Sequence, residues 1–323
     1  MTQDTVRAVV RGVGHYLPTR VVPNSEFEKT LDTTDEWIKA RSGIERRHFA
    51  AEGETTSHMA TVAAQNALKM AGLEASDIDA LIVATSTPDL TFPSAATMVQ
   101  AELDMKRGFA FDIQAVCAGF VFALANANAL VISGQAERVL VIGAETFSRI
   151  MDWTDRGTCV LFGDGAGAVV LTQSNAPGIL SSHLHADGRY ANILQVSGGI
   201  AEGKVRGNPY LEMDGGAVFK FAVRNLGDCA QQALAHNGLR GEQLDWLVPH
   251  QANMRIIKAI AERVGLPMEQ VVTTVAKHGN TSAASVPLAL DCAVRDGRIQ
   301  PGQHLLLEGV GGGMTWGAVL IRW

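Results

Sequence analysis

Short apolar runs alternate along the chain with longer segments in which apolar residues recur at helical spacing. RVLVIG at 138–143 and HLLLEG at 304–309 are apolar runs of strand length, whereas ALKMA at 67–71 belongs to an amphipathic helical segment that Gly72 ends. Strands that alternate with helices in this way predict a mostly parallel sheet with helices on both faces.

The helix, its terminal glycine and the following strand recur after 166 residues. AQNALKMAGLEASDIDAL at 64–81 aligns without a gap with AQQALAHNGLRGEQLDWL at 230–247. The strands at 138–143 and 304–309 keep this offset, and each leads towards a glycine-rich closing strand, GAGAVVL or GMTWGAVLI. Several elements in one order favour an internal duplication over chance similarity.

Two copies of this unit predict two pseudo-symmetric βαβαβ halves packed in five layers, α/β/α/β/α. We expect the first half at 1–171 and the second within 172–323. The residues at about 172–215, rich in Gly, Ser and His, are expected to form an irregular connector with little regular structure.

Composition restricts the classes of function. Hydrophobic residues make up 47% and charged residues 19%, which suffices for a buried core, and a net charge of −6 argues against a general nucleic-acid-binding surface. The longest apolar run, 115–125, is too short to span a bilayer, which needs roughly 20 residues, and the start of the chain lacks a signal-peptide pattern. We therefore expect no membrane partner and no nucleic-acid partner.

Four isolated cysteines form no CxxC pair, so neither a zinc ribbon nor a redox motif is expected: Cys117, Cys159, Cys229 and Cys292. This usage suits a reducing cytosol and predicts a cytoplasmic location.

Cys117 is the candidate nucleophile. In DIQAVCAGF it lies at a predicted strand-to-helix turn, where the helix dipole and free N–H groups favour a thiolate, and Ala118 and Gly119 leave room for a substrate. Cysteine is also among the residue types most often buried, so the position taken alone favours a structural role.

His250 and Asn280 change this balance. His250 ends a strand in LVPHQAN, and Asn280 lies in the turn HGNTSAAS before a helix. Either residue alone is more often an ordinary turn residue. However, the repeat offset carries position 117 to 283, close to Asn280, so pseudo-twofold symmetry predicts that these turns meet in one central cleft.

AVCAG, PHQAN, HGNTSAAS and GGGMTWG, in this order and spacing, resemble β-ketoacyl-ACP synthase III, the initiating condensing enzyme of type II fatty-acid synthesis. The resemblance runs from GVGHYLP at 12–18 to the C-terminus and implies a thiolase-like fold. It also implies a Cys117–His250–Asn280 triad that makes 3-oxoacyl-ACP, CoA and CO₂ from malonyl-ACP and a short acyl-CoA, with acetyl-CoA as the expected primer.

The resemblance assigns a role to each member of the triad. Cys117 takes the acyl group as a thioester, and His250 and Asn280 stabilise the malonyl enolate. The backbone N–H groups of Cys117 and Gly312 hold the second oxyanion. The residues leave open whether His250 also helps to deprotonate Cys117.

The resemblance further implies a set of residues that bind CoA: Thr33, Trp37, Arg41, Arg156 and Asn253. Trp37 and Arg156 would sandwich the adenine, although Trp37 alone suits a surface packing residue equally well. Gly216 departs from the family, in which well-known members carry an asparagine that touches pantetheine, and this puts the affinity for CoA in doubt.

Two protein contacts are implied as well. Phe92 matches the residue that crosses a homodimer interface and closes the partner's acyl pocket, but it also suits simple interface packing. For the acyl carrier protein, four basic residues pair at helical spacing: Lys220 with Arg224, and Arg255 with Lys258. Their ordinary alternative is a solvated helix face.

Other functions remain in competition. A thiolase would need a second cysteine near GVGGGMTWG, and a hydroxymethylglutaryl-CoA synthase would need a glutamate near the nucleophile, which DIQAVCAG lacks. A secondary-metabolic starter-unit condensing enzyme or acyltransferase stays open, as does a non-catalytic acyl-carrier or scaffold protein, although the intact triad argues against the latter. No metal or redox cofactor is implied, since the CoA thioester is a substrate, and primer preference stays open.

Overall fold

The computed structural model describes residues 6–323. Residues 1–5 lie outside the described residues, and they include the start of the segment for which no signal peptide is expected. Within 6–323, no helix has both the length and the apolar character needed to cross a membrane.

The first half contains a five-stranded sheet in the order β1-β7-β6-β4-β5. β4 runs parallel to β5 and β6, whereas β7 runs antiparallel to β6 and β1. The strands are β1 (Arg7–Tyr16), β4 (Ala80–Ala84), β5 (Phe109–Ile113), β6 (Arg138–Thr146) and β7 (Asp164–Ser174).

The second half repeats this topology in the order β13-β14-β15-β8. β13 and β14 are parallel, and β15 pairs antiparallel with β14 and β8. A parallel bridge from Leu247 to Val271 lies where the first half has β5. The strands are β8 (Ile179–Ala186), β13 (Trp246–Pro249), β14 (His304–Gly311) and β15 (Thr315–Arg322).

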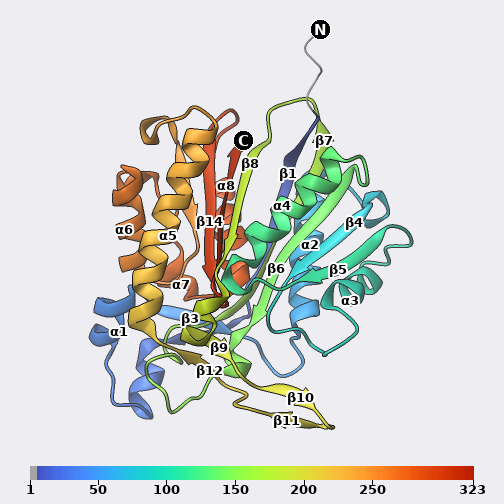
Figure 1. Ribbon diagram of the computed structural model, residues 1–323. Helices are drawn as coiled ribbons and strands as arrows, with labels where there is room; N and C mark the ends of the chain where they lie inside the picture. The colour runs from blue at the N-terminus through green and yellow to red at the C-terminus, as the bar shows by residue number, and fades with distance from the viewer. Residues whose placement is uncertain (1–5) are drawn as a thin grey trace.

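Helices complete the five layers (Figure 1). α2 (Thr56–Ala71) and α3 (Ala95–Glu102) cover the outer face of the first sheet, and α5 (Gly215–His236) and α6 (Met254–Val264) cover that of the second. α4 (Gly119–Ile132) and α8 (Ser285–Arg295) fill the space between the sheets. The predicted thiolase-like fold with two pseudo-symmetric halves is confirmed.

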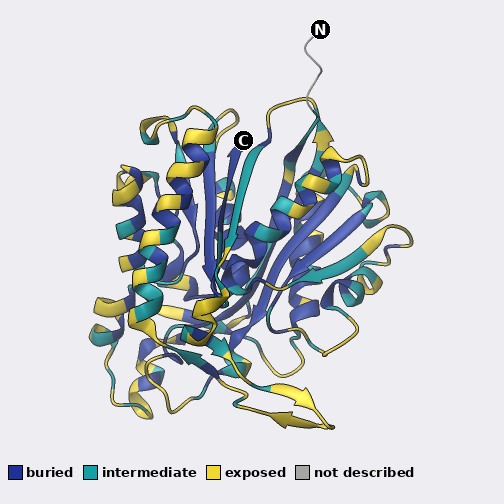
Figure 2. Ribbon diagram, viewed as in Figure 1, coloured by how far each residue is buried: buried dark blue, intermediate teal, exposed yellow. Residues whose placement is uncertain are grey.

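Smaller elements surround one end of the sheets. Short strands pair as β2 with β3, β9 with β12 and β10 with β11, and the last pair is exposed in Figure 2. Their bounds are β2 (Arg20–Pro23), β3 (Arg46–Phe49), β9 (Leu194–Val196), β10 (Gly199–Ala201), β11 (Lys204–Arg206) and β12 (Leu211–Met213), with α1 (Asp35–Ser42) and α7 (Val275–His278).

The 3-10 turns follow the same repeat. η2 and η6 are separated by 166 residues, as are η3 and η8, and the helices α4 and α8 that follow η3 and η8. The turns are η1 (Asn24–Lys29), η2 (Ala75–Asp77), η3 (Val116–Ala118), η4 (Phe147–Ile150), η5 (Gly188–Ile193), η6 (Gly241–Gln243), η7 (Met268–Gln270) and η8 (Ser282–Ala284).

Period-two burial explains how each sheet separates two cores. In β6, Val139 and Val141 face the central helices, whereas Leu140 and Ile142 face α2 and α3. In β14, Leu305 likewise faces the centre. The strands are buried on both faces, as Figure 2 shows, because helices cover both sides of a mostly parallel sheet.

The expectation of an irregular connector at 172–215 is wrong. This segment contains β8, which is the edge strand of the second sheet, together with β9 to β12. β8 reads ILSSHLHA, and its polar side chains bond within the strand, as His183 does to Ser181, or to α5, as His185 does to Gln232. An edge strand with such side chains carries no apolar period to read. The division after residue 171 stays a prediction, and β7 itself runs on to Ser174.

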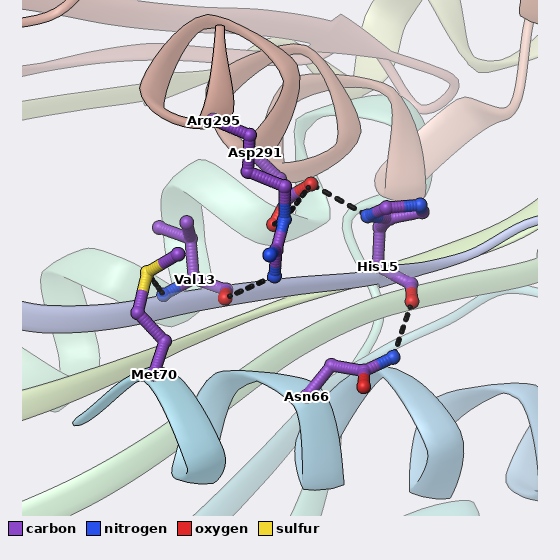
Figure 3. Close-up of polar contacts among 6 residues, drawn as sticks. All are labelled: Val13, His15, Asn66, Met70, Asp291 and Arg295. Carbon is purple, nitrogen blue, oxygen red and sulfur yellow. Dashed lines mark hydrogen bonds and ion pairs between the residues drawn. The ribbon is translucent and has the colours of Figure 1, made fainter. Parts of the chain in front are cut away.

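Polar contacts tie β1 to helices on both sides (Figure 3). From α8, Asp291 lies 2.5 Å from Nδ1 of His15, and Arg295 donates both to Asp291 and to the carbonyl of Val13. From α2, Asn66 donates to the carbonyl of His15 at 3.0 Å. These bonds connect the second half to the first through the central layer.

Gly143 on β6 sets how closely the halves approach, which leads to a first prediction. A Cβ there would lie 2.3 Å from the carbonyl oxygen of Ala283 on η8. Overpacking of this kind typically costs about 1–3 kcal/mol. We therefore expect Gly143→Ala to lower the free energy of unfolding by that amount, measured by urea denaturation.

Gly188→Ala is the matched control, because a Cβ at position 188 meets nothing within 4 Å. The control should leave the urea midpoint almost unchanged. Equal midpoints for the two variants would contradict a tight contact between β6 and η8.

Candidate active site

Cys117 lies in η3, between the end of β5 and the start of α4. Val116 before it has φ +48°, a left-handed conformation that is strained for a β-branched residue. The thiol is buried. Burial raises the pKa of Cys117 to about 12, which opposes the thiolate that the helix terminus favours.

The turn between β14 and β15 packs directly against η3. A Cβ on Gly311 would lie 2.5 Å from the carbonyl oxygen of Ala115 and 2.7 Å from the backbone nitrogen of Cys117. Only glycine permits this approach. Gly312 follows in the same turn, so its backbone lies near the nucleophile, although the described cavity is not lined by Gly312.

His250 follows β13 and is 4% exposed. Its Nδ1 lies 2.6 Å from the hydroxyl of Ser285, whose oxygen also accepts the backbone N–H of Gln251 at 3.3 Å. We therefore assign the Ser285 O–H as donor to Nδ1, which places the imidazole proton on Nε2. Burial lowers the pKa of His250 to about 3, so the ring is neutral near pH 7 and offers an N–H donor.

Asn280 is held in the turn before η8. Its Oδ1 accepts the backbone N–H of Ser282 at 2.9 Å, and its own backbone joins Leu161 and Gly163. Because the amide oxygen is engaged, the side-chain NH₂ is the group left to act as a donor. His250 and Asn280 thus both offer uncharged N–H groups.

The three predicted residues meet in one cavity of about 510 Å³. Cys117, His250 and Asn280 all line it, as do Trp37 and Arg156. Apolar side chains from β9, β12, α5 and β14 form much of the wall: Leu194, Met213, Phe219 and Val310. A cavity of this size suits a narrow flexible chain.

The predicted CoA residues cluster on and beside α1. The guanidinium of Arg41 lies 4.5 Å from the Trp37 ring centroid and that of Arg156 lies 5.3 Å from it. Arg156 also donates to the backbone and carboxylate of Asp32. The side chain of Thr33 is partly buried and, in the described residues, stands outside the cavity lining.

Asn253 lines the cavity and caps α6. Its Oδ1 accepts the Arg255 backbone N–H at 2.8 Å, and its Nδ2 donates to the Arg41 carbonyl at 2.9 Å. Gly216 lies opposite on α5, where a Cβ would meet only Asp214 at 3.5 Å. The space that an asparagine would occupy is therefore open.

The predicted basic patch divides into two pairs. Lys220 and Arg255 are exposed and line the cavity mouth, where the Arg255 guanidinium lies 5.4 Å from the Phe219 ring centroid. Arg224 and Lys258 are exposed farther along α5 and α6 and, among the described residues, do not line the cavity. Phe92 is also outside the lining and is 82% exposed.

Sequence reasoning missed three buried polar residues around the triad. Ser285 supports His250, and Ser282 lies against Cys117 while donating to Glu145 at 3.0 Å. The available signals were the hydroxyls of HGNTSAAS and a charged residue at the end of the apolar strand RVLVIGAE. Within 6–323, no group of three or more His, Cys, Asp and Glu could hold a metal ion, and the expected lack of a metal cofactor stays a prediction.

Two family models match this chain. The model described as 3-Oxoacyl-[acyl-carrier-protein (ACP)] synthase III matches residues 111–188, and the model for its C terminal matches residues 234–323. The first match contains Cys117, and the second contains His250 and Asn280.

Solved structures share the fold along nearly the whole chain. A 3-oxoacyl-[acyl-carrier-protein] synthase III from Aquifex aeolicus VF5 superposes with a TM-score of 0.93 at 45% identity, covering 98% of this chain and 100% of that one. The priming β-ketosynthase of the R1128 polyketide pathway superposes with 0.91 at 38% identity, covering 97% and 96%.

Curated relatives named beta-ketoacyl-[acyl-carrier-protein] synthase III are closely similar. The protein from Rhodobacter capsulatus is 65% identical over 325 residues, and that from Roseobacter denitrificans is 64% identical over 325 residues. Each alignment covers 99% of this chain and 100% of the relative. The chain therefore belongs to the β-ketoacyl-ACP synthase III family.

Proposed function

We propose that this acyltransferase condenses a short acyl-CoA with malonyl-ACP through a thioester on Cys117, giving 3-oxoacyl-ACP, CoA and CO₂. The observation that carries the proposal is the single cavity that joins a buried thiol to two neutral N–H donors and to a cationic mouth. This reaction initiates fatty-acid synthesis, and the family membership of the chain supports it.

The first half-reaction is acyl transfer. CoA would enter with its adenine between Trp37 and Arg156, which now touch one another, and its phosphates near the cations of Arg41 and Arg156. Asn253 and the open space at Gly216 border the path of the pantetheine arm. The Cys117 sulfur then attacks the acyl carbonyl, and CoA leaves.

The second half-reaction needs charge stabilisation without a fixed cation. Loss of CO₂ from malonyl-ACP places negative charge on the thioester oxygen, and the N–H groups of His250 and Asn280 can both donate to it. Attack of this enolate on the acyl group develops a second oxyanion, for which the backbone N–H groups of Cys117 and Gly312 are the proposed donors.

Phe92 supports a homodimer of this chain. Leu90 and Phe92, on the loop after β4, are both exposed, and neighbouring exposed apolar side chains mark protein–protein contact sites. We propose that a second copy of this chain covers Phe92 and that its ring closes the partner's acyl pocket, which would favour short primers. The free cysteines suit a cytoplasmic enzyme.

A second candidate is supported by one neighbour. The priming β-ketosynthase of a polyketide pathway has the same fold over nearly the same length. Comparing turnover with acetyl-CoA, branched and longer acyl-CoA primers, each with malonyl-ACP, separates the two. Preference for acetyl-CoA supports fatty-acid initiation, whereas preference for an unusual primer supports the starter-unit role.

The nucleophile gives the second prediction. Treatment of the protein with acetyl-CoA should add one acetyl group to Cys117, because Cys117 is the cysteine that lines the described cavity. Intact-mass measurement should detect the adduct in the wild type and in Cys229→Ala, a buried cysteine outside the cavity lining. An acetyl adduct on Cys117→Ala would sink the assignment.

The third prediction separates the half-reactions. His250→Ala and Asn280→Ala should each slow malonyl-ACP decarboxylation by ~100–1000-fold, the usual effect of removing one oxyanion donor. Acetylation of Cys117 should fall much less. Because the pKa of His250 is lowered to about 3, the decarboxylation rate should show no inflection from this histidine between pH 5 and 8.

Radioactive CO₂ release from labelled malonyl-ACP reports decarboxylation, and the acetyl adduct reports acylation. Equal losses of both rates in both variants would remove support for enolate stabilisation.

The fourth prediction tests the basic mouth. Carrier proteins are acidic and this chain carries −6, so docking depends on local positive charge. The double variant Lys220→Glu and Arg255→Glu should raise KM for malonyl-ACP, and the increase should shrink as salt rises. Acetylation by acetyl-CoA should change little in comparison.

The pair Arg224→Glu and Lys258→Glu is the matched control, with the same change of charge on the same helices but away from the cavity lining. Its KM for malonyl-ACP should rise less. An equal rise in both double variants would place docking on the whole α5 and α6 face instead of the mouth.

A further inference from the structure

The thiol of Cys117 must lose its proton before it can attack. His250 would be the obvious proton acceptor, but its tautomer prevents it from taking this proton. With the Ser285 hydroxyl assigned as the donor to Nδ1 of His250, Nε2 carries the imidazole proton. In this tautomer the imidazole has no free lone pair to offer Cys117. Another group must take the proton.

Glu145 is a buried carboxyl at the end of β6, and its oxygens are the acceptors in every described hydrogen bond that they make. Its Oε2 accepts the Thr85 hydroxyl at 3.2 Å, the Ser86 N–H at 3.0 Å, and the Thr87 N–H and hydroxyl at 3.1 and 2.5 Å. Its Oε1 accepts the Ser282 hydroxyl at 3.0 Å. Donors alone favour the ionised carboxylate, which is the form that can accept a proton.

Ser282 connects this carboxylate to the nucleophile. The η8 turn that carries Ser282 packs against the η3 turn that carries Cys117, so the Ser282 hydroxyl that donates to Glu145 also lies near the Cys117 thiol, whose pKa it lowers. Ser282 has φ +48°, and its backbone N–H is held by Oδ1 of Asn280. A strained residue fixed by its neighbours is typical of positions that hold a functional group in place.

We propose that Glu145 accepts the Cys117 proton through the hydroxyl of Ser282. The S–H bond breaks as Ser282 Oγ takes that proton, and the original hydroxyl proton of Ser282 moves to Oε1 of Glu145. The negative charge thereby moves from the carboxylate to the sulfur. After acyl transfer the proton returns along the same route to the departing CoA sulfur, which restores the carboxylate. This inference rests on the proposed nucleophilic role of Cys117.

The electrostatics of the pair fit a single shared negative charge. Burial raises the pKa of Glu145 to about 7, and the Glu145 charge adds to the burial that raises the pKa of Cys117. Among the described residues, the hydrogen-bond partners of the carboxyl are hydroxyls and backbone amides from the end of β4 and from η8. Its titratable neighbour among these residues is Cys117 on η3. A base with a pKa near the working pH is effective in general base catalysis.

The test follows acetyl-Cys117 formation from acetyl-CoA by rapid quench and intact mass between pH 5.5 and 9.5. In the wild type the rate should rise through about pH 7, as Glu145 loses its proton, and then level off. Glu145→Gln should lower the rate at pH 7.5 by ~100-fold or more, the usual contribution of a general base. The residual rate should keep rising up to pH 9.5, because the thiol must then ionise directly.

Ser282→Gly is the second variant, because glycine accepts φ +48° and the backbone should fold as before. It should reproduce the loss and the altered pH profile of Glu145→Gln, with an unchanged KM for acetyl-CoA. Glu308→Gln is the matched control, since Glu308 is another buried carboxyl with a raised pKa, but no described hydrogen bond joins its side chain to Ser282 or Cys117. Its rate and profile should match the wild type.

The relay would be overturned if the acetylation rate of Glu145→Gln or Ser282→Gly still rose through about pH 7 and then levelled off, as expected for the wild type. An equal loss in Glu308→Gln would also overturn it, since the effect would then come from disturbing any buried carboxyl. Failure of the wild type itself to form acetyl-Cys117 would instead refute the proposed nucleophile, so the two hypotheses fail separately.

Discussion

The contact between η3 and η8 at the pseudo-twofold axis is the constraint on which the rest of the site depends. Val116 and Ser282 occupy equivalent positions in the repeat, 166 residues apart, and both have φ +48°. Gly143 and Gly311 leave no room for a Cβ against these turns. Two strained turns can persist only where the surrounding sheets over-determine them. The five layers supply that rigidity and bring Cys117 and Asn280 to the same cavity.

The charges are arranged so that the interior and the mouth do different work. Inside, His250 is neutral and Asn280 is an amide, so developing negative charge meets fixed dipoles instead of a desolvated cation. At the mouth, Arg41 and Arg156 are exposed to solvent. Cations there can attract phosphates without the penalty of burial, whereas neutral donors inside cost no reorganisation when the oxyanion forms.

The sequence could predict those features that repeat or that are local in the chain. The 166-residue offset was enough to bring Cys117 and Asn280 to one cleft, because apolar period and terminal glycines are local signals. Glu145 could not be predicted, because it is not adjacent to Cys117 in DIQAVCAG. Its carboxyl is connected to the site through Ser282, which lies 137 residues further along the chain. β8 could not be predicted, because this edge strand of serines and histidines shows no alternation of apolar and polar residues. Its pairing with β15 is what makes it a strand.

The duplication also explains why the axis holds one active site and not two. The repeat equivalents of Cys117 and Glu145 are Ala283 and Gly311, and the glycine is what admits the Cys117 backbone at that point. Conversely, the equivalents of the His250–Ser285 pair are Ala84 and Gly119, which also touch one another, with a Cβ on Gly119 lying 3.1 Å from that of Ala84. Each half keeps large polar groups where the other keeps small residues. Because both turns crowd the same axis, a second nucleophile or a second histidine would lack the space that the first one uses.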